Sequence, residues 1–149
     1  MKIIDIKTQD IRFPTSKDNL GTDAVHVDCD YSATYVTIFT DQKDLTGIGL
    51  TFTIGKGNDL CCAVVEHFKE FIIGKDIEEI EKDIASIWEK ITNHSQLRWV
   101  GPQKGVTHLA AAAFFNAIWD LISKFHKKPL WRYIIAVSYT HLRAHETCT

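Results

Sequence analysis

The sequence lacks three features that mark whole classes of protein. It has no long apolar run: the longest, Leu109 to Phe115, has seven residues, far fewer than the roughly 20 that span a bilayer. It has no basic excess, because 17 Lys and Arg stand against 19 Asp and Glu, a net charge of −2. It has no C-x-x-C pair for zinc or redox chemistry. We therefore expect no membrane partner and no nucleic-acid partner.

The sequence also lacks a signal-peptide pattern at its start, where apolar and charged residues alternate from Met1 to Asp5. Its four cysteines, Cys29, Cys61, Cys62 and Cys148, show no pairing pattern, which is typical of thiols in a reducing compartment. We expect a cytoplasmic protein, or a mitochondrial one if the source is eukaryotic. The 149 residues, 45% of them hydrophobic, are typical of one soluble domain with a real core.

The first half of the chain predicts three strands. Residues 2–13, 31–40 and 47–54 are rich in β-branched, aromatic or alternating apolar residues. A short polar link, 41–44, joins the last two strands, so they are expected to pair antiparallel. The apolar residues of these patterns are Ile4, Ile6, Ile11 and Phe13 in the first strand, Tyr35, Val36, Ile38 and Phe39 in the second, and Ile48, Leu50, Phe52 and Ile54 in the third. We expect the apolar residues of the second strand to face the core and those of the third strand to share one face.

The second half predicts helices over about 58–73, 76–91 and 107–125, with a further helix starting near Leu130. Each has apolar residues at spacings of three and four, among them Leu60 in the first helix and Leu109 in the third. Strands followed by helices predict an α+β fold, a three-stranded antiparallel meander followed by a three- to four-helix bundle.

Two segments between these elements are candidates for function. The polar loop 15–30 is longer than the usual connection, and such loops are often functional. It contains His26-x-Asp28-x-Asp30, which suits either a metal site or a solvated, substrate-facing loop. The Gly55-Lys56-Gly57 turn matches neither phosphate-binding motif, so turn glycines before a helix are the simpler interpretation.

A third candidate is the segment 97–105, LRWVGPQKG, in which Arg98 and Lys104 flank a Gly-Pro turn. A rigid turn that presents a cation suits an anionic group such as a carboxylate. The alternative is a solvated loop between helices, with Trp99 in the core, and spacing does not separate the two. No G-x-S-x-G or Cys–His arrangement indicates nucleophilic catalysis, so the residues alone disclose no reaction.

Five strings in the chain resemble the L-fuconate dehydratase branch of the enolase superfamily. They are RFPTS (12–16), DYSATYV (30–36), GLTFTIGKGN (49–58), QLRWVGPQKGVTHLAAAA (96–113) and AIWDL (117–121). The resemblance covers about residues 1–133 and implies an N-terminal capping domain. Residues 134–149 fit no element and resemble a translated cloning sequence, so we expect a non-native or disordered tail.

The resemblance implies a hydro-lyase that converts L-fuconate into a 2-keto-3-deoxy acid and water. In this superfamily a (β/α)₈ barrel holds Mg²⁺ and the acid and base groups, and the cap closes over the barrel mouth. A barrel needs roughly 250 residues, so this chain is expected to lack it. We therefore expect no catalytic residue and no metal ligand here, and a fragment that is inactive alone.

The resemblance also implies which residues contact the acid-sugar substrate. These are Gly21, Thr22, Asp23, Tyr31 and Lys104. Thr22 stands where relatives have a smaller residue, and Gln103 where many have Glu. The expected partners are the substrate and the missing barrel, with a homo-oligomeric parent as a further expectation. The alternative is a free-standing α+β binding module without catalysis.

Overall fold

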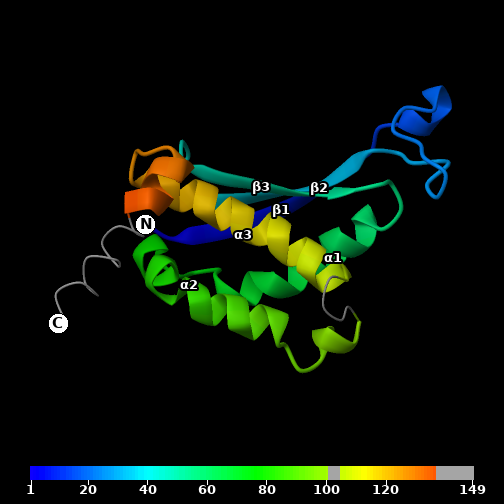
Figure 1. Ribbon diagram of the computed structural model, residues 1–149. Coiled ribbons are helices and arrows are strands. Elements are labelled where there is room, and N and C mark those ends of the chain that lie inside the picture. Colours follow the sequence, from blue (N-terminus) through cyan, green and yellow to red (C-terminus); the bar gives the residue numbers. More distant parts are fainter. Residues whose placement is uncertain (101–104, 137–149) are drawn as a thin grey trace, which may run out of the picture.

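The computed structural model describes residues 1–100 and 105–136 (Figure 1). The strands β1 (Ile3–Ile11), β2 (Ser32–Thr40) and β3 (Thr46–Thr53) form one antiparallel sheet in the order β1-β2-β3. The helices are α1 (Asn58–Phe68), α2 (Ile77–Thr92) and α3 (Val106–Phe125), and residues 130–136 are helical too. The predicted α+β fold is confirmed. No (β/α)₈ barrel occurs within these residues.

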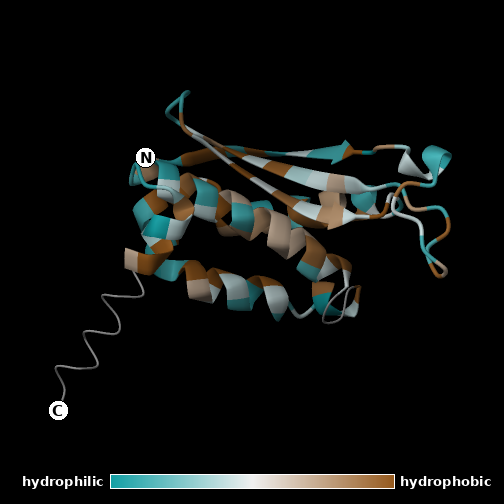
Figure 2. Cartoon of the chain, turned by 45° about the horizontal axis from the view of Figure 1, so that its top comes forward, coloured by the Kyte–Doolittle hydropathy of each residue, from teal (hydrophilic) through white to brown (hydrophobic). Residues whose placement is uncertain are grey.

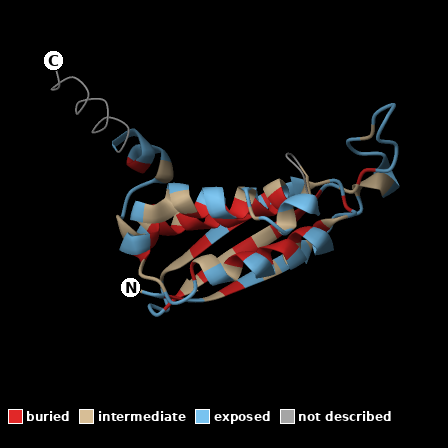
Figure 3. Ribbon diagram, turned by 90° about the horizontal axis from the view of Figure 1, so that it is seen from below, coloured by how far each residue is buried: buried red, intermediate tan, exposed pale blue. Residues whose placement is uncertain are grey.

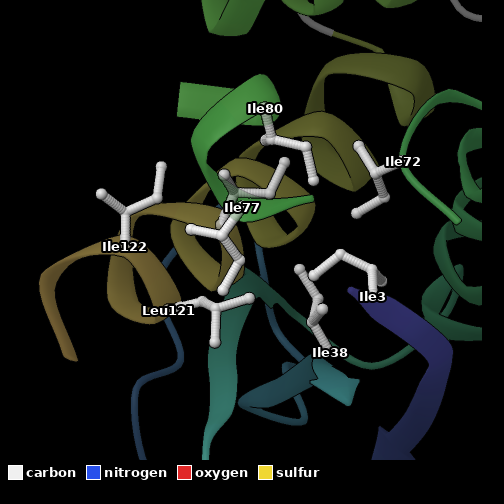
Figure 4. A pocket seen from close by; sticks show the side chains of 8 residues that line it. Ile3, Ile38, Ile72, Ile77, Ile80, Leu121 and Ile122 are labelled. Atoms are coloured by element: carbon white, nitrogen blue, oxygen red, sulfur yellow. The ribbon is translucent and has the colours of Figure 1, made fainter. Parts of the chain in front are cut away.

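The helices cover one face of the sheet (Figure 1). α3 packs against β2 and β3, while α1 contacts β1, β2 and α3. Figure 4 shows one end of the core, where apolar side chains from the sheet and helices converge. They are Ile3, Ile38, Ile72, Ile77, Ile80, Ile118, Leu121 and Ile122. By length and composition alone α3 could cross a membrane, but most of it is buried inside the protein.

The four apolar residues predicted for β3 share one face, as their period-two pattern predicts, and this face is not covered by the helices. Ile48, Leu50, Phe52 and Ile54 lie on the outer face and are 48%, 40%, 56% and 45% exposed. The residues that face α3 are Gly47, Gly49 and Thr51, all of them buried. A Cβ added at Gly47 or Gly49 would lie within 3.0 Å of α3 backbone atoms, nearer than real Cβ atoms approach. The glycines therefore let a helix lie directly on the strand.

The other strands show small differences from the prediction. In β1, Ile3 and Ile6 face the core, because the register shifts between Ile3 and Asp5, while Ile4 and Phe13 are exposed. In β2, Val36 and Ile38 are buried as expected. Tyr35 and Phe39 are only partly buried, because successive residues of a strand face opposite sides. Leu60 of α1 and Leu109 of α3, which belong to the predicted apolar patterns of their helices, are also exposed.

Polar contacts fix the ends of the helices where the sequence predicts them. Asp76 and Glu79 form a capping box at the start of α2. The Met1 amine donates a hydrogen bond to Asp76 Oδ1 at 2.9 Å, which lowers the pKa of that carboxyl. Gly74 follows the preceding helical segment with a φ of +79°, as a helix-ending glycine does. Of the predicted tail, 134–149, residues 134–136 continue the helix that begins at residue 130, because the helical pattern runs further than expected, and residues 137–149 lie outside the described residues.

Candidate functional site

The long loop between β1 and β2, residues 12–31, projects from one end of the sheet (Figure 1). It is largely exposed, unlike the helix and strand faces that pack together (Figure 3). Together with the turn after β3 it forms an open hollow of about 590 Å³. The hollow is lined by Arg12, Ser16, Val25, His26, Asp28, Cys29, Asp30, Ile54, Gly55 and Lys56. Two of the sequence candidates, the polar loop and the glycine turn, thus meet at one site.

The two ends of the loop are joined by side-chain hydrogen bonds. The Thr15 hydroxyl donates to Cys29 O and accepts from Tyr31 N, both at 2.9 Å. Ser16 donates to Asp30 Oδ1 from its hydroxyl at 2.7 Å and from its backbone N–H at 3.1 Å. The bond from the Ser16 hydroxyl has the larger effect, the bond from its backbone N–H the smaller, and both lower the pKa of the Asp30 carboxyl. Asp30 N also donates to Ile54 O at 3.1 Å, so the base of the loop is fixed to the sheet.

Tyr31 and Gly21, both predicted substrate contacts, lie together. The Tyr31 hydroxyl donates to Gly21 O at 3.0 Å, and its ring packs edge-on against Phe52 with centroids 5.4 Å apart. Gly21 has a φ of +75°, and a Cβ there would collide with the Tyr31 ring. The positive φ favours glycine, and any Cβ would force the end of the Tyr31 side chain to move. In this structure Tyr31 holds the loop through Gly21, and its hydroxyl oxygen can still accept a further hydrogen bond.

Asp23 and Thr22 lie in the exposed part of the loop. Asp23 Oδ1 accepts hydrogen bonds from His26 N at 2.7 Å and Val25 N at 2.8 Å. The His26 bond, and then the Val25 bond, lower the pKa of Asp23. Thr22 Oγ1 donates to Asn19 O at 3.1 Å. The ionised Asp23 carboxylate therefore stabilises the turn that it belongs to. Val25 beside it is 82% exposed, and Figure 2 shows hydrophobic residues on this part of the loop.

The structure does not support the metal interpretation of His26-x-Asp28-x-Asp30. The Asp30 carboxylate is bonded to Ser16, and His26 Nδ1 lies 3.2 Å from Asp23 Oδ2. Within residues 1–100 and 105–136, no three His, Cys, Asp or Glu side chains lie close enough to hold a metal ion.

The cationic turn is described only in part. Lys104 lies outside the described residues, so its predicted role stays untested. Trp99, which the alternative interpretation placed in the core, is 86% exposed.

A polar network beneath the hollow was not expected from the sequence. Arg12 donates to Asp10 from Nε and Nη2, at 2.9 Å and 2.7 Å, and Asp10 Oδ1 also accepts from Asn58 Nδ2 at 2.9 Å. The Arg12 bond is the main reason that the pKa of Asp10 is lowered. Asn58 is fully buried and bonds Thr53 as well. Asp10 and Arg12 are two residues apart in an extended segment and therefore share a face. This spacing is the feature of the sequence from which their contact could have been predicted.

The structure defines the class of protein as an α+β domain. Helices cover one face of its sheet, and a loop site lies at one end of the sheet. The chain belongs to the mandelate racemase / muconate lactonizing enzyme N-terminal domain family, whose model matches residues 22–134. This family places it in the enolase superfamily, as the sequence resemblance implied.

Named relatives support this membership. Mitochondrial enolase superfamily member 1 of Xenopus laevis is 47% identical over 135 residues, which are 90% of this chain and 30% of that protein. L-galactonate dehydratase of Hypocrea jecorina is 46% identical over 132 residues, 89% of this chain and 29% of that protein. The crystal structure of human mitochondrial enolase superfamily member 1 is 44% identical with a TM-score of 0.85, over 90% of this chain and 31% of that one.

A more distant structure, a racemase from Streptomyces coelicolor A3(2) with bound magnesium, is 26% identical with a TM-score of 0.57 over 80% of this chain and 29% of that one. The chain thus spans about 30% of the length of the curated relatives it matches. None of these matches names a fuconate enzyme, so the fuconate branch expected from the sequence stays a proposal.

Proposed function

We propose that this chain is the capping part of an acid-sugar dehydratase and that its loop 12–31 contacts the substrate. The observation that carries the proposal is the construction of this loop: a base fixed by Thr15, Ser16 and Asp30, and an exposed part around Asp23. Loops held on a rigid scaffold are where binding residues concentrate. The 46% identity to an L-galactonate dehydratase supports the substrate class.

The chemistry of the reaction belongs to the part of the relatives that this chain does not cover. In enolase-type sites a Mg²⁺ ion, when bound, stabilises the enediolate formed after removal of the proton α to a carboxylate. The described residues of this chain gather no ligand set for that ion, so we assign the chain no step that involves the metal. Its residues would bind the polar end of the acid sugar, orient it and exclude water.

Within this class we propose a six-carbon aldonate of L-galacto configuration. L-Fuconate, the substrate expected from the resemblance, is L-galactonate without the hydroxyl on C6, so the two acids differ only there. The loop offers both apolar and polar groups for that position: Val25 is exposed beside the carboxylate of Asp23, and Val27 is exposed two residues further along. The ratio of kcat/KM for the two acids measures which chemistry the loop prefers. We propose the cytoplasm or the mitochondrion as the location, since relatives carry the name mitochondrial.

The test uses residues 1–133 fused to the remainder of the human relative in place of its own N-terminal part. We expect the 149-residue chain alone to give no 2-keto acid from L-fuconate or L-galactonate with Mg²⁺, and the fusion to give it. In the fusion, Asp23→Ala, Tyr31→Ala and Lys104→Ala should each lower kcat/KM about 5- to 150-fold, which corresponds to about 1–3 kcal/mol for an unpaired partner.

The Mg²⁺ dependence should stay unchanged in all three variants. Asp44→Ala is the matched control, because Asp44 lies in the turn between β2 and β3, at the other end of the sheet from the loop. An active Lys104→Ala fusion would remove that residue from the proposed site. Turnover by the isolated chain, or a loss of Mg²⁺ affinity in a loop variant, would contradict the division of roles between cap and barrel.

A further inference from the structure

Strand β3 lies at an edge of the sheet and has the composition of a strand that pairs readily with others. Its residues Thr46–Thr53, TGIGLTFT, include no charge and no proline. Ile48, Leu50 and Phe52 alternate along it and are exposed on the outer face. An exposed apolar edge strand of this kind is a template for another chain.

Three polar side chains of α3 bond to the backbone of this edge. They come from positions four residues apart in α3 and bind residues two apart in β3, a set that we call the edge ladder. The bonds are Asn116 Nδ2 to Leu50 O at 3.3 Å, Ile48 N to Asp120 Oδ2 at 2.8 Å, and Lys124 Nζ to Thr46 O at 3.0 Å. Four helical residues rise about 6.0 Å and two strand residues about 6.8 Å, so the bonded residues are spaced almost equally along the helix and the strand.

The ladder depends on how closely α3 lies against β3. Gly47 and Gly49 alternate with the three bonded strand residues, and a Cβ at either would meet the backbone of Ala113 or Ala117. Because the helix approaches so closely, side chains as short as Asn116 and Asp120 reach the strand. Lys124 Nζ also lies 2.6 Å from Asp120 Oδ2, so the Asp120 carboxylate forms an ion pair with Lys124.

We propose that the edge ladder blocks strand addition at β3, and that a second copy of this chain would add its own β3 there if the ladder were removed. The second copy is the occupant because it brings the same uncharged strand, and a two-fold antiparallel pairing places the two rows of exposed apolar residues on one continuous face. This proposal is independent of the substrate of the longer protein.

The test compares the full chain with Asp120→Ala by amide hydrogen exchange at Ile48 and by sedimentation velocity over a range of concentrations. In the original chain the Ile48 amide is protected by Asp120. In Asp120→Ala it should exchange at least about tenfold faster at low concentration, and then slow again as a dimer forms at higher concentration. Asp120→Asn retains an acceptor oxygen and should resemble the original chain.

Asp83→Ala is the matched control, because it removes one carboxylate from α2, where Asp83 pairs with Lys90 at 3.7 Å. It should change neither exchange at Ile48 nor mass. Association through the exposed outer face would raise the mass of every variant without protecting Ile48. If Asp120→Ala does not fold, Asn116→Ala combined with Lys124→Ala provides the same comparison of mass. Unchanged exchange at Ile48 in Asp120→Ala, or a ladder variant no more dimeric than Asp83→Ala, would overturn the proposal.

Discussion

Gly49→Ala tests how the helix and the sheet pack. By backbone propensity alone this change in a strand should help, because glycine loses more conformational freedom on folding and costs about 0.5–1 kcal/mol relative to alanine. The structure predicts the opposite sign. The new Cβ would lie within 3.0 Å of Ala113 O and Ala117 N, and both are backbone atoms that cannot move aside alone.

The magnitude follows from what must move to admit the methyl group. Ordinary Cβ contacts begin near 3.4 Å, so α3 must shift away from β3 as a unit. Overpacking a close-packed core costs about 1–3 kcal/mol, and we expect the upper end of this range because a 20-residue helix is displaced. With a urea m-value of about 1.5–2 kcal/mol/M, a loss of about 3 kcal/mol lowers the unfolding midpoint by about 1.5–2 M.

The assay is urea unfolding followed by tryptophan fluorescence and far-UV circular dichroism. Ile48→Val, one residue away on the exposed face, is the control and should stay within about 0.5 kcal/mol of the original chain. A Gly49→Ala chain that is as stable as the original, or more stable, would refute the close approach of α3 to β3.

Two further predictions concern ionised side chains. Because the pKa of Asp30 is lowered in the folded chain, its ionised form stabilises the fold above the ordinary pKa of about 3.9, and this stabilisation is lost as the pH falls through the lower folded value. The protection of the Ser16 amide, its exchange rate relative to the unfolded rate at the same pH, should then fall, and protection that does not change with pH would contradict this. Tyr133→Phe removes the hydroxyl that donates to Glu81, and we expect a loss of about 1–3 kcal/mol at neutral pH. Burial raises the pKa of Glu81, but the bonds from Tyr133 and His126 outweigh it and lower the pKa. The difference between the two chains in urea unfolding should therefore shrink in acid, and an equal difference at about pH 3.5 would refute it.

The order of strands and helices was predictable, because it depends on local patterns. Alternating β-branched residues mark β2, and Asp76 with Glu79 marks the start of α2. These signals act over a few residues and need no partner from elsewhere in the chain. The loop 15–30 could also be identified as a candidate site, since its length and polarity are visible in the sequence.

The geometry of the candidate site could not be read in the same way. The bond from Tyr31 to Gly21 and the bonds from Ser16 to Asp30 join residues 10 and 14 positions apart. No period relates such residues, because the path of the loop decides whether they meet. The resemblance placed Gly21 and Tyr31 at one site, but it did not show that the tyrosine hydroxyl bonds the glycine carbonyl.

The sequence by itself determined that β3 is a strand with one apolar and one small-residue face. Only the tertiary structure decided which face is buried. The apolar pattern favours burying Ile48, Leu50 and Phe52, but Gly47 and Gly49 face the helix instead. The reason is that the small residues let α3 approach closely enough to pack its own buried alanines, Ala113 and Ala117, on the sheet. Close packing between two backbones is a property of the pair, and neither segment's pattern contains it.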